Sequence, residues 1–348
     1  MTVDSRSRRQ FCRLFGTALA IPACARHGIA AGPVPSRRDR LVAARTWMMQ
    51  LDDLDEPDAV ARLEATTYPL LVLEAGLDLR DDPYDPRPML SRLRTTPAGA
   101  TRLLLANVDV GNAESSRTYW RTDWSAPTRH GPGRPDFLLG VDPDGWTGLY
   151  PVAFWDPRWK ALWLGEDGAI ARLARAGFDG VCLEGVDVYD DDTVAAEAER
   201  RRIDPDDEMM QFIEEIRAAG RRVTPDFLIV PYNAHYLLDS DPVRYTRAID
   251  ALIAEDTWFN GQAEAAWEDA RAGDLPQRHD GEESTERRLA QCRKFMDRGV
   301  PVFSVDYCVS RTNAAFVYRE ARKAGLRPLV TRVALSRLTD TPPEAFQQ

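Results

Sequence analysis

The chain has 348 residues, a formal net charge of -10 and 44% hydrophobic residues. This length suits one large domain, because α/β barrels of about 250 residues fold as a single unit, and the apolar content supports a sizeable core rather than global disorder. The acidic balance argues against a nucleic-acid binder, which needs a basic patch to neutralise phosphates, so no nucleic-acid partner is expected.

The first thirty residues read as a targeting segment. The pair Arg8-Arg9 precedes an apolar stretch rich in small residues, Leu14 to Ala23, which is typical of a twin-arginine export signal. This stretch is too short for a finished transmembrane helix, so none is expected in the mature chain. We therefore expect export to the periplasm or the cell exterior. The alternative is a basic tail that happens to precede apolar residues.

Cys24 follows the small residue Ala23, so it is also a candidate for lipid attachment, which would make the mature chain a membrane-anchored lipoprotein. A stretch with several prolines and arginines comes next and reads as a linker. The expected organisation is a signal over residues 1–30, a linker over 31–40, a single barrel domain over 41–338 and a C-terminal tail over 339–348.

From residue 41 onward, short apolar runs alternate with amphipathic segments. The expected strands cover residues 46–51, 69–77, 101–110, 150–155, 181–183, 227–230, 248–254 and 301–305. The expected helices cover residues 58–65, 88–93, 158–176, 208–219, 285–298 and 313–324. Several of these helices are followed by glycine, which favours the left-handed conformation just past a helix end.

Eight strand-helix units in one chain of this length predict an α/β fold, a closed (β/α)8 TIM barrel. An open, doubly wound sheet is the alternative, and it is disfavoured because no Gly-rich dinucleotide or phosphate fingerprint follows the first strand. One connection, residues 115–149, is long and rich in Pro, Gly and Trp. Such a loop inside a compact domain is often the wall of an active site.

Acidic and aromatic residues follow most of the expected strands. The acids are Asp52, Glu74, Asp109, Glu184, Asp187, Glu255, Asp256 and Asp306, and the neighbours are Trp120, Trp146, Trp155, Tyr232, Asn233 and Tyr307. Any one of these acids is ordinarily a helix cap or a loop residue. Because the carboxyl ends of barrel strands meet at one mouth, the whole set indicates a cleft lined by carboxylates and rings. Such a cleft suits a sugar polymer, since acids bind hydroxyls or attract amino groups and rings stack on pyranose faces.

Six segments carry a resemblance to a known family: LANVDVGNAESSRTYW, GLYPVAFWDPRWKALW, GFDGVCLEGVD, PDFLIVPYN, IDALIAEDTWFNG and GVPVFSVDY. In this order, over roughly residues 41 to 338, they resemble the glycoside-hydrolase family 114 group, which includes endo-α-1,4-polygalactosaminidases. The resemblance implies a TIM barrel and hydrolysis of α-1,4-linked, galactosamine-containing exopolysaccharide by two carboxylates, without a cofactor.

The resemblance also implies the site residues. The family's acid after the fifth expected strand falls on Glu184, and its glutamate after the seventh falls on Glu255, so these two are the expected catalytic pair. Glu255 as acid/base and Glu184 as nucleophile is one assignment, and the reverse stays open. The residues expected to bind and orient the sugar are Asp109, Glu114, Trp155, Asp187, Tyr232, Asn233, Asp306 and Tyr307.

The sequence departs from the family pattern in three places: Glu184 replaces the usual aspartate, Asn112 replaces an acid, and Tyr232 replaces a glutamine. These departures leave open a second class of function, a non-catalytic barrel that binds polysaccharide without cleaving it. A metal-dependent hydrolase is a weaker alternative. The four histidines, His27, His130, His235 and His279, have no metal-ligand spacing, so no metal is expected.

Overall fold

The computed structural model describes residues 35–75, 85–277, 281 and 284–343. These residues belong to one compact unit that begins at Pro35. The expected export signal and Cys24 lie outside the described residues. Among the described helices, none has the length and apolar character needed to cross a bilayer.

The described residues form a closed ring of parallel strands. In spatial order they are β1 (Met48–Gln50), β2 (Leu70–Glu74), β3 (Leu103–Asp109), β6 (Gly180–Glu184), β7 (Leu228–Pro231), β8 (Leu252–Glu255), β11 (Val302–Tyr307) and β12 (Arg327–Thr331). A parallel bridge between Tyr232 and Ile253 joins β7 to β8. The chain after β12 returns to β1, where Leu51 N donates to Leu335 O at 2.8 Å. The predicted (β/α)8 barrel is therefore confirmed.

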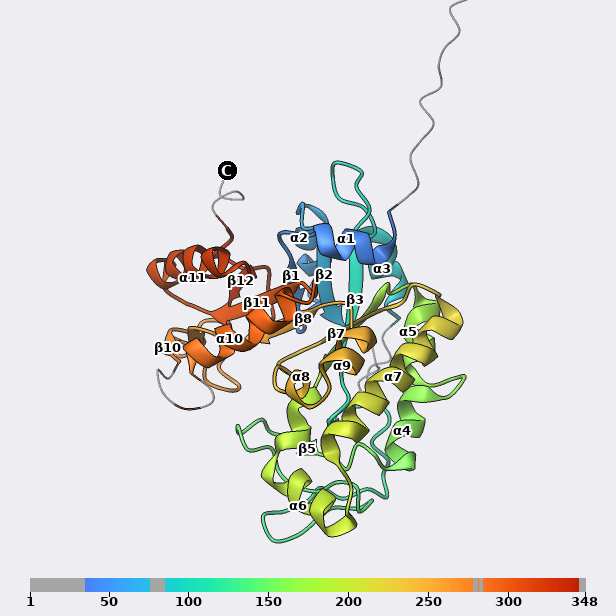
Figure 1. Ribbon diagram of the computed structural model, residues 1–348. Helices are drawn as coiled ribbons and strands as arrows, with labels where there is room; N and C mark the ends of the chain where they lie inside the picture. Colours follow the sequence, from blue (N-terminus) through green and yellow to red (C-terminus); the bar gives the residue numbers. More distant parts are fainter. Residues whose placement is uncertain (1–34, 76–84, 278–280, 282–283, 344–348) are drawn as a thin grey trace, which may run out of the picture. The chain divides into compact units, whose positions relative to one another are not determined.

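Helices surround these strands (Figure 1). They are α1 (Arg37–Ala43), α2 (Ala59–Glu64), α3 (Arg87–Leu93), α4 (Pro157–Leu164), α5 (Ala169–Ala176), α6 (Asp192–Arg201), α7 (Pro205–Val223), α8 (Leu237–Ser240), α9 (Pro242–Ala248), α10 (Thr285–Met296) and α11 (Arg311–Ala324). A 3-10 helix, η1 (Val186–Asp190), follows β6. Helix α11 packs on β12, α10 on β11 and α7 on β7, so helices cover the outer face of the ring, and the apolar runs of the strands are buried.

Four strands share one burial pattern, which leaves their last residues partly exposed. β2, β3, β6 and β8 are buried along their whole length except at the last residue, which is partly exposed. That last residue is an acid in every case: Glu74, Asp109, Glu184 and Glu255. The apolar part of each strand therefore holds a carboxyl group at the carboxyl end of the barrel.

One expected strand is wrong, and one barrel strand was missed. Residues 150–155 were expected to form the fourth barrel strand, but β5 (Leu149–Pro151) pairs antiparallel with β4 (Asn112–Glu114) outside the barrel. The eighth barrel strand is β12, whose Arg327 and Pro328 interrupt the apolar pattern. Arg327 fits there because its guanidinium lies 5.0 Å from the Phe303 ring centre and donates to Leu41 O at 3.0 Å. β6 is thus the fourth barrel strand and β8 the sixth.

The expected helix over 158–176 is two helices. Asp156 caps the first, accepting from Arg158 N at 2.8 Å. The break lies at Gly165 to Gly168, where Gly168 N donates to Gly165 O at 2.9 Å. A Cβ atom on Gly168 would lie 2.6 Å from Trp163 O, so this turn requires a residue without a side chain.

The two ends of the domain are more ordered than the sequence indicated. Helix α1 occupies part of the expected linker 31–40, and its Arg37 Nε donates to the buried Asp179 carboxylate at 2.7 Å. At the other end, residues of the expected tail pack on the barrel, since Tyr318 Oη donates to Thr341 O at 2.9 Å. Two short strands, β9 (Phe259–Asn260) and β10 (Leu275–Pro276), form an antiparallel pair after β8.

Candidate active site

The register of the parallel strands turns the acidic ends toward one opening. Residues paired across a parallel ladder point to the same face, and so do residues two apart on one strand. Asp109 pairs with Glu184 across β3 and β6. Tyr232 pairs with Ile253 across β7 and β8, and Glu255 lies two residues further along β8. All of these side chains therefore face the barrel interior at its carboxyl end.

Glu184 lies in the most acidic part of this mouth. Its Oε2 accepts a hydrogen bond from Asn107 Nδ2 at 2.8 Å. Burial and the neighbouring carboxyl groups of Asp109 and Glu255 raise the pKa of Glu184 to about 8, against the opposing effect of the Asn107 donor. In the free protein at neutral pH, the Glu184 side chain therefore holds a proton.

Glu255 is held by hydrogen-bond donors on both carboxylate oxygens. Asn233 Nδ2 donates to Oε2 at 3.0 Å, while Asn233 Oδ1 accepts from Glu255 N at 2.9 Å. The Tyr307 hydroxyl donates to Oε1 and lies 3.2 Å from the Tyr232 hydroxyl. Asn233 has φ 61°, a left-handed conformation that asparagine tolerates. These contacts fix the Glu255 carboxylate in one orientation.

Asp109 closes the turn between β3 and β4. Its Oδ1 accepts from Gly111 N at 3.0 Å and from Asn112 N at 2.7 Å, and its Oδ2 accepts from Asn112 Nδ2 at 3.0 Å. Burial and the Glu114 carboxylate raise the pKa of Asp109 to about 7. Asn112 stands where the family has an acid. It stabilises the Asp109 carboxylate by donating hydrogen bonds to it. A Cβ on Gly185 would lie 2.2 Å from Asp109 Oδ1, so the turns after β3 and β6 are packed together.

Arg117 joins two other carboxylates of the mouth. Its Nη1 donates to Glu74 Oε1 at 2.7 Å, and its Nε donates to Glu114 Oε2 at 2.8 Å. Tyr119 supports the same turn, because its hydroxyl accepts from Glu114 N at 2.8 Å. Sequence reasoning missed Arg117; the signal that points to it is its position three residues after Glu114.

One expected sugar-binding residue is misplaced. Asp306 is fully buried, and its Oδ1 accepts from Trp258 N at 2.6 Å and from Phe259 N at 3.0 Å. It precedes Tyr307 on β11, so the two side chains point to opposite faces of the strand. Asp306 therefore holds the turn after β8, and the prediction that it binds the sugar is wrong.

The two remaining expected residues lie in different surroundings. Asp187 is exposed on η1, one turn past Glu184. Trp155 is buried, with its ring centre 4.9 Å from that of Phe154. Within the described residues, no hydrogen bond joins Trp155 to either glutamate of the expected catalytic pair. Asp187 is thus available to a ligand, whereas Trp155 is a core residue.

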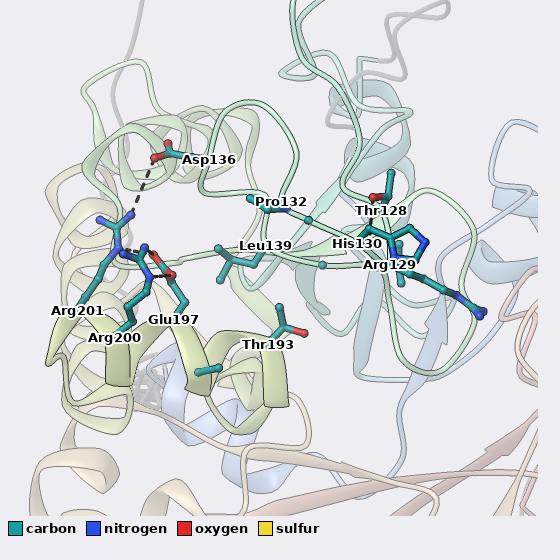
Figure 2. Close-up of a pocket in the computed structure, with 14 residues that line it drawn as sticks. Thr128, Arg129, His130, Pro132, Asp136, Leu139, Thr193, Glu197, Arg200 and Arg201 are labelled. Atoms are coloured by element: carbon teal, nitrogen blue, oxygen red, sulfur yellow. Dashed lines mark hydrogen bonds and ion pairs between the residues drawn. The ribbon is translucent and has the colours of Figure 1, made fainter.

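A separate cavity of about 500 Å³ lies between the long connection after β3 and helix α6 (Figure 2). On α6, Glu197 accepts from Arg200 and Arg201, and Arg201 Nη2 lies 4.0 Å from Asp136 Oδ2 at one side of the cavity. None of the four strand-end acids lines it. Within the part of the chain that the structure describes, no group of three or more His, Cys, Asp or Glu side chains is arranged to hold a metal ion.

Comparisons with known proteins show the family of the chain. Residues 42–346 match glycoside-hydrolase family GH114. An uncharacterised protein of Deinococcus radiodurans is 32% identical over 306 residues, which cover 87% of this chain and 85% of that protein.

Two solved structures share the fold at low identity. The glycoside hydrolase domain of PelA from Pseudomonas aeruginosa aligns with a TM-score of 0.57 and 16% identity, covering 86% of this chain and 98% of that domain. Aspergillus fumigatus Ega3, solved in complex with galactosamine, aligns with a TM-score of 0.53 and 16% identity, covering 89% and 97%. These alignments bear on the fold. The match over nearly the whole barrel and the Deinococcus relative show that the chain belongs to glycoside-hydrolase family GH114.

Proposed function

We propose that this glycoside hydrolase cleaves within chains of α-1,4-linked, galactosamine-containing polysaccharide, and that Glu184 and Glu255 are its catalytic pair. The observation that carries the proposal is the set of strand-end acids facing one opening, with these two glutamates held by side-chain donors. β6 and β8 are two strand spacings apart, about 10 Å between backbones, and both side chains face the barrel axis. Carboxyl groups so arranged can flank one glycosidic bond.

The charge of the mouth favours an amino sugar. Glu184 and Asp109 repel each other, and this repulsion contributes to the raised pKa of Glu184. The ammonium group of a deacetylated galactosamine unit would relieve that repulsion, whereas a fully acetylated, neutral unit would not. Asp187, exposed at the rim, adds a further acid that such a cation can approach. Ega3, one of the structural neighbours, was solved with galactosamine bound.

The chemistry requires one carboxylic acid to protonate the leaving oxygen and one carboxylate to attack the anomeric carbon or activate water. In the free enzyme the raised pKa of Glu184 holds a proton at neutral pH, while Glu255 receives hydrogen bonds from Asn233 and Tyr307. A bound ammonium group lowers the pKa of nearby carboxyl groups, so the resting protonation does not assign the roles. Analysis of the products of Glu184 and Glu255 variants is needed to tell the acid/base from the nucleophile.

The decisive experiment measures reducing ends released from partially deacetylated galactosamine polymer. Glu184→Gln and Glu255→Gln each lose at least about 100-fold in kcat, because each removes a group that transfers a proton or attacks carbon. Glu268→Gln, at a surface glutamate paired with Arg337, is the matched control and keeps full activity. A wild-type enzyme that binds the polymer in a pull-down but releases no reducing ends contradicts the hydrolase mechanism.

A second measurement separates the two roles. Glu184→Ala and Glu255→Ala are assayed with added azide, and the anomeric form of the product is read by NMR. If the wild type retains the anomeric configuration, azide takes the place of the missing nucleophile and gives a glycosyl azide of inverted configuration, whereas at the acid/base position azide attacks the glycosyl-enzyme and its product keeps the original configuration. For a retaining wild type, a retained azide product from both variants, or from neither, means that the two residues do not divide the nucleophile and acid/base roles between them.

We also propose that the chain is exported by the twin-arginine route before it acts on polysaccharide. The support is the Arg8-Arg9 pair ahead of an apolar stretch. In cell fractions, Arg8→Lys combined with Arg9→Lys retains the chain in the cytoplasm, and Cys24→Ser abolishes labelling by a fatty-acid probe if Cys24 carries a lipid. Export of the double variant at the wild-type level contradicts the route, and an unlabelled wild type contradicts the anchor.

A further inference from the structure

The backbone directly after Glu255 is held from outside the barrel by three side chains. Arg288 Nη1 donates to Glu255 O at 2.7 Å, Gln277 Nε2 donates to Asp256 O at 3.1 Å, and Thr285 Oγ1 donates to Thr257 O at 2.7 Å. Three consecutive carbonyl groups therefore accept hydrogen bonds from donors that lie directly after β10 and in the first turn of α10. We refer to Gln277, Thr285 and Arg288 as the carbonyl clamp.

The same backbone is held on its amide side. Asp256 N donates to Val305 O at 3.0 Å. Trp258 N and Phe259 N both donate to Asp306 Oδ1. Asp256 has φ 52°, a left-handed conformation that is strained for a non-glycine residue and persists only where the surroundings over-determine it. The clamp supplies that constraint, so the strand ends abruptly with Glu255 facing the mouth.

Arg288 differs from the other two members because it carries a charge. Burial raises the pKa of Asp306 to about 7, and Arg288 opposes this shift. It opposes the burial-driven rise in the pKa of Asp256 in the same way. His235, a neighbour of Arg288, is buried. Burial and the Arg288 charge lower the pKa of His235 to about 3, so His235 is neutral. Arg288 is therefore a positive charge set among the acids behind Glu255.

We propose that Arg288 is a positioning residue for Glu255: it acts on catalysis by holding the Glu255 backbone, without contacting the sugar. This inference rests on the proposed role of Glu255. It is carried by the 2.7 Å contact from Arg288 to the Glu255 carbonyl and by the strained Asp256 that follows it. Arg288 belongs to α10 and reaches β8 from outside the set of strands that bear the four strand-end acids.

The test is a double-mutant cycle on the galactosamine polymer. Arg288→Met lowers kcat by about 10- to 100-fold with KM changed less than about threefold, because a small displacement of a reacting group costs rate rather than binding. Arg288→Lys recovers part of the loss. In the Glu255→Gln background Arg288→Met causes no further loss, since its effect passes through Glu255. Arg293→Met, at an exposed position on the same helix, is the control and leaves both constants unchanged.

A second readout does not depend on activity. Amide hydrogen exchange of the peptide spanning residues 252–260 speeds up at least about tenfold in Arg288→Met and not in Arg293→Met, because the clamp no longer holds that backbone. Thermal melting establishes that both variants are folded. Unchanged exchange, or losses that multiply in the double variant, overturns the inference. A wild-type enzyme that releases no reducing ends overturns the proposed function instead, and the exchange measurement then still decides whether Arg288 holds the backbone.

Discussion

The two glutamates of the proposed catalytic pair sit in opposite surroundings. Glu184 accepts from one amide, on Asn107, and is surrounded by other acids, whereas Glu255 accepts from Asn233 and Tyr307. Donors stabilise an ionised carboxylate, and neighbouring acids destabilise it. Burial and the surrounding acids raise the pKa of Glu184 to about 8, and the donors to Glu255 hold its carboxylate in one orientation.

The Tyr307 hydroxyl is the sharpest test of how Glu255 is held. Tyr307→Phe removes the donor to Oε1 and lowers kcat by about 10- to 100-fold, which corresponds to the roughly 1.5 to 3 kcal/mol of a hydrogen bond to a charged group. Tyr232→Phe is the matched control, because the Tyr232 hydroxyl meets the Tyr307 hydroxyl, 3.2 Å away, and so lies one hydrogen bond further from the carboxylate. We expect it to cost less than about fivefold, since the donor to Oε1 stays in place. Equal losses in the two variants, measured as steady-state kcat on the polymer, contradict a direct role for Tyr307.

Arg117 allows a prediction about charge balance. Arg117→Met leaves Glu74 and Glu114 without the guanidinium that joins them, and two carboxylates then face each other in a partly buried site. We expect the variant to lose about 2 to 4 kcal/mol of unfolding free energy at pH 7, because breaking a buried pair leaves uncompensated charge. Arg121→Met, at an exposed ion pair with Asp123, is the control and changes stability by less than about 1 kcal/mol.

Urea unfolding of both variants measures the difference. Burial raises the pKa of Glu74, so the loss in Arg117→Met shrinks as the pH falls and Glu74 takes up a proton, and the comparison is made at about pH 5 and pH 7. A loss of the same size at both values would mean that packing of the arginine side chain, and not its charge, is responsible.

At the scale of elements, the acidic strand ends could be predicted from the sequence, but the identity of every barrel strand could not. Short apolar runs followed by acids predicted β2, β3, β6 and β8 in nearly their observed places. β12 was missed because its first two residues, Arg327 and Pro328, look unlike a buried strand. Only the tertiary contacts of Arg327, with the Phe303 ring and the α1 carbonyl groups, make a buried arginine acceptable there.

Asp306 was misplaced for a reason that the sequence does contain. Adjacent residues on a strand point to opposite faces, so Asp306 and Tyr307 cannot both face the mouth. The apolar run before them does not say which of the two faces inward; that follows from the pairing of Val305 with Glu255. Arg117 and Arg288 lie on a loop and a helix, where no strand pattern indicates a role.

The turn after β6 gives a prediction at this scale. Gly185 has φ 65°, and a Cβ there would lie 2.2 Å from Asp109 Oδ1, so Gly185→Ala combines backbone strain with a clash. Gly99 has φ 82°, and a Cβ there would meet no atom within 4 Å, so Gly99→Ala carries strain alone. We expect Gly99→Ala to cost about 1 kcal/mol and Gly185→Ala clearly more, with loss of activity. Equal melting temperatures of the two variants would rule out a tight contact between the turns after β3 and β6.

At the scale of the whole molecule, closing the barrel gathers acids that are far apart in the sequence. β2 and β8 lie on opposite sides of the ring, yet both end in a partly exposed glutamate. Bringing these carboxyl groups together raises the free energy of the folded state, and the effect appears in the pH dependence of stability. The proposed function and the stability of the barrel are thus linked through the same protons.

That linkage has a definite sign. The pKa of Glu184 is about 8 in the folded chain against 4.5 for an ordinary glutamate, so between these values the folded chain holds a proton that the unfolded chain releases. Stability therefore falls as the pH rises through this window and levels off above about pH 8. Asp109, whose pKa is raised from 3.8 to about 7, adds a slope of the same sign at lower pH.

Glu184→Gln removes the ionisable group and keeps the side-chain shape. We expect the difference in unfolding free energy between this variant and the wild type to rise by at least about 1 kcal/mol from about pH 5 to pH 8. Because Glu184 is partly exposed, this difference stays well below the free energy that the full pKa shift would give. Urea unfolding at one-unit pH steps measures it, with Glu268→Gln as a control of equal charge change at the surface. Parallel curves for wild type and Glu184→Gln would mean that Glu184 is already ionised in the free enzyme. The proton needed for cleavage would then have to come from another acid of the mouth.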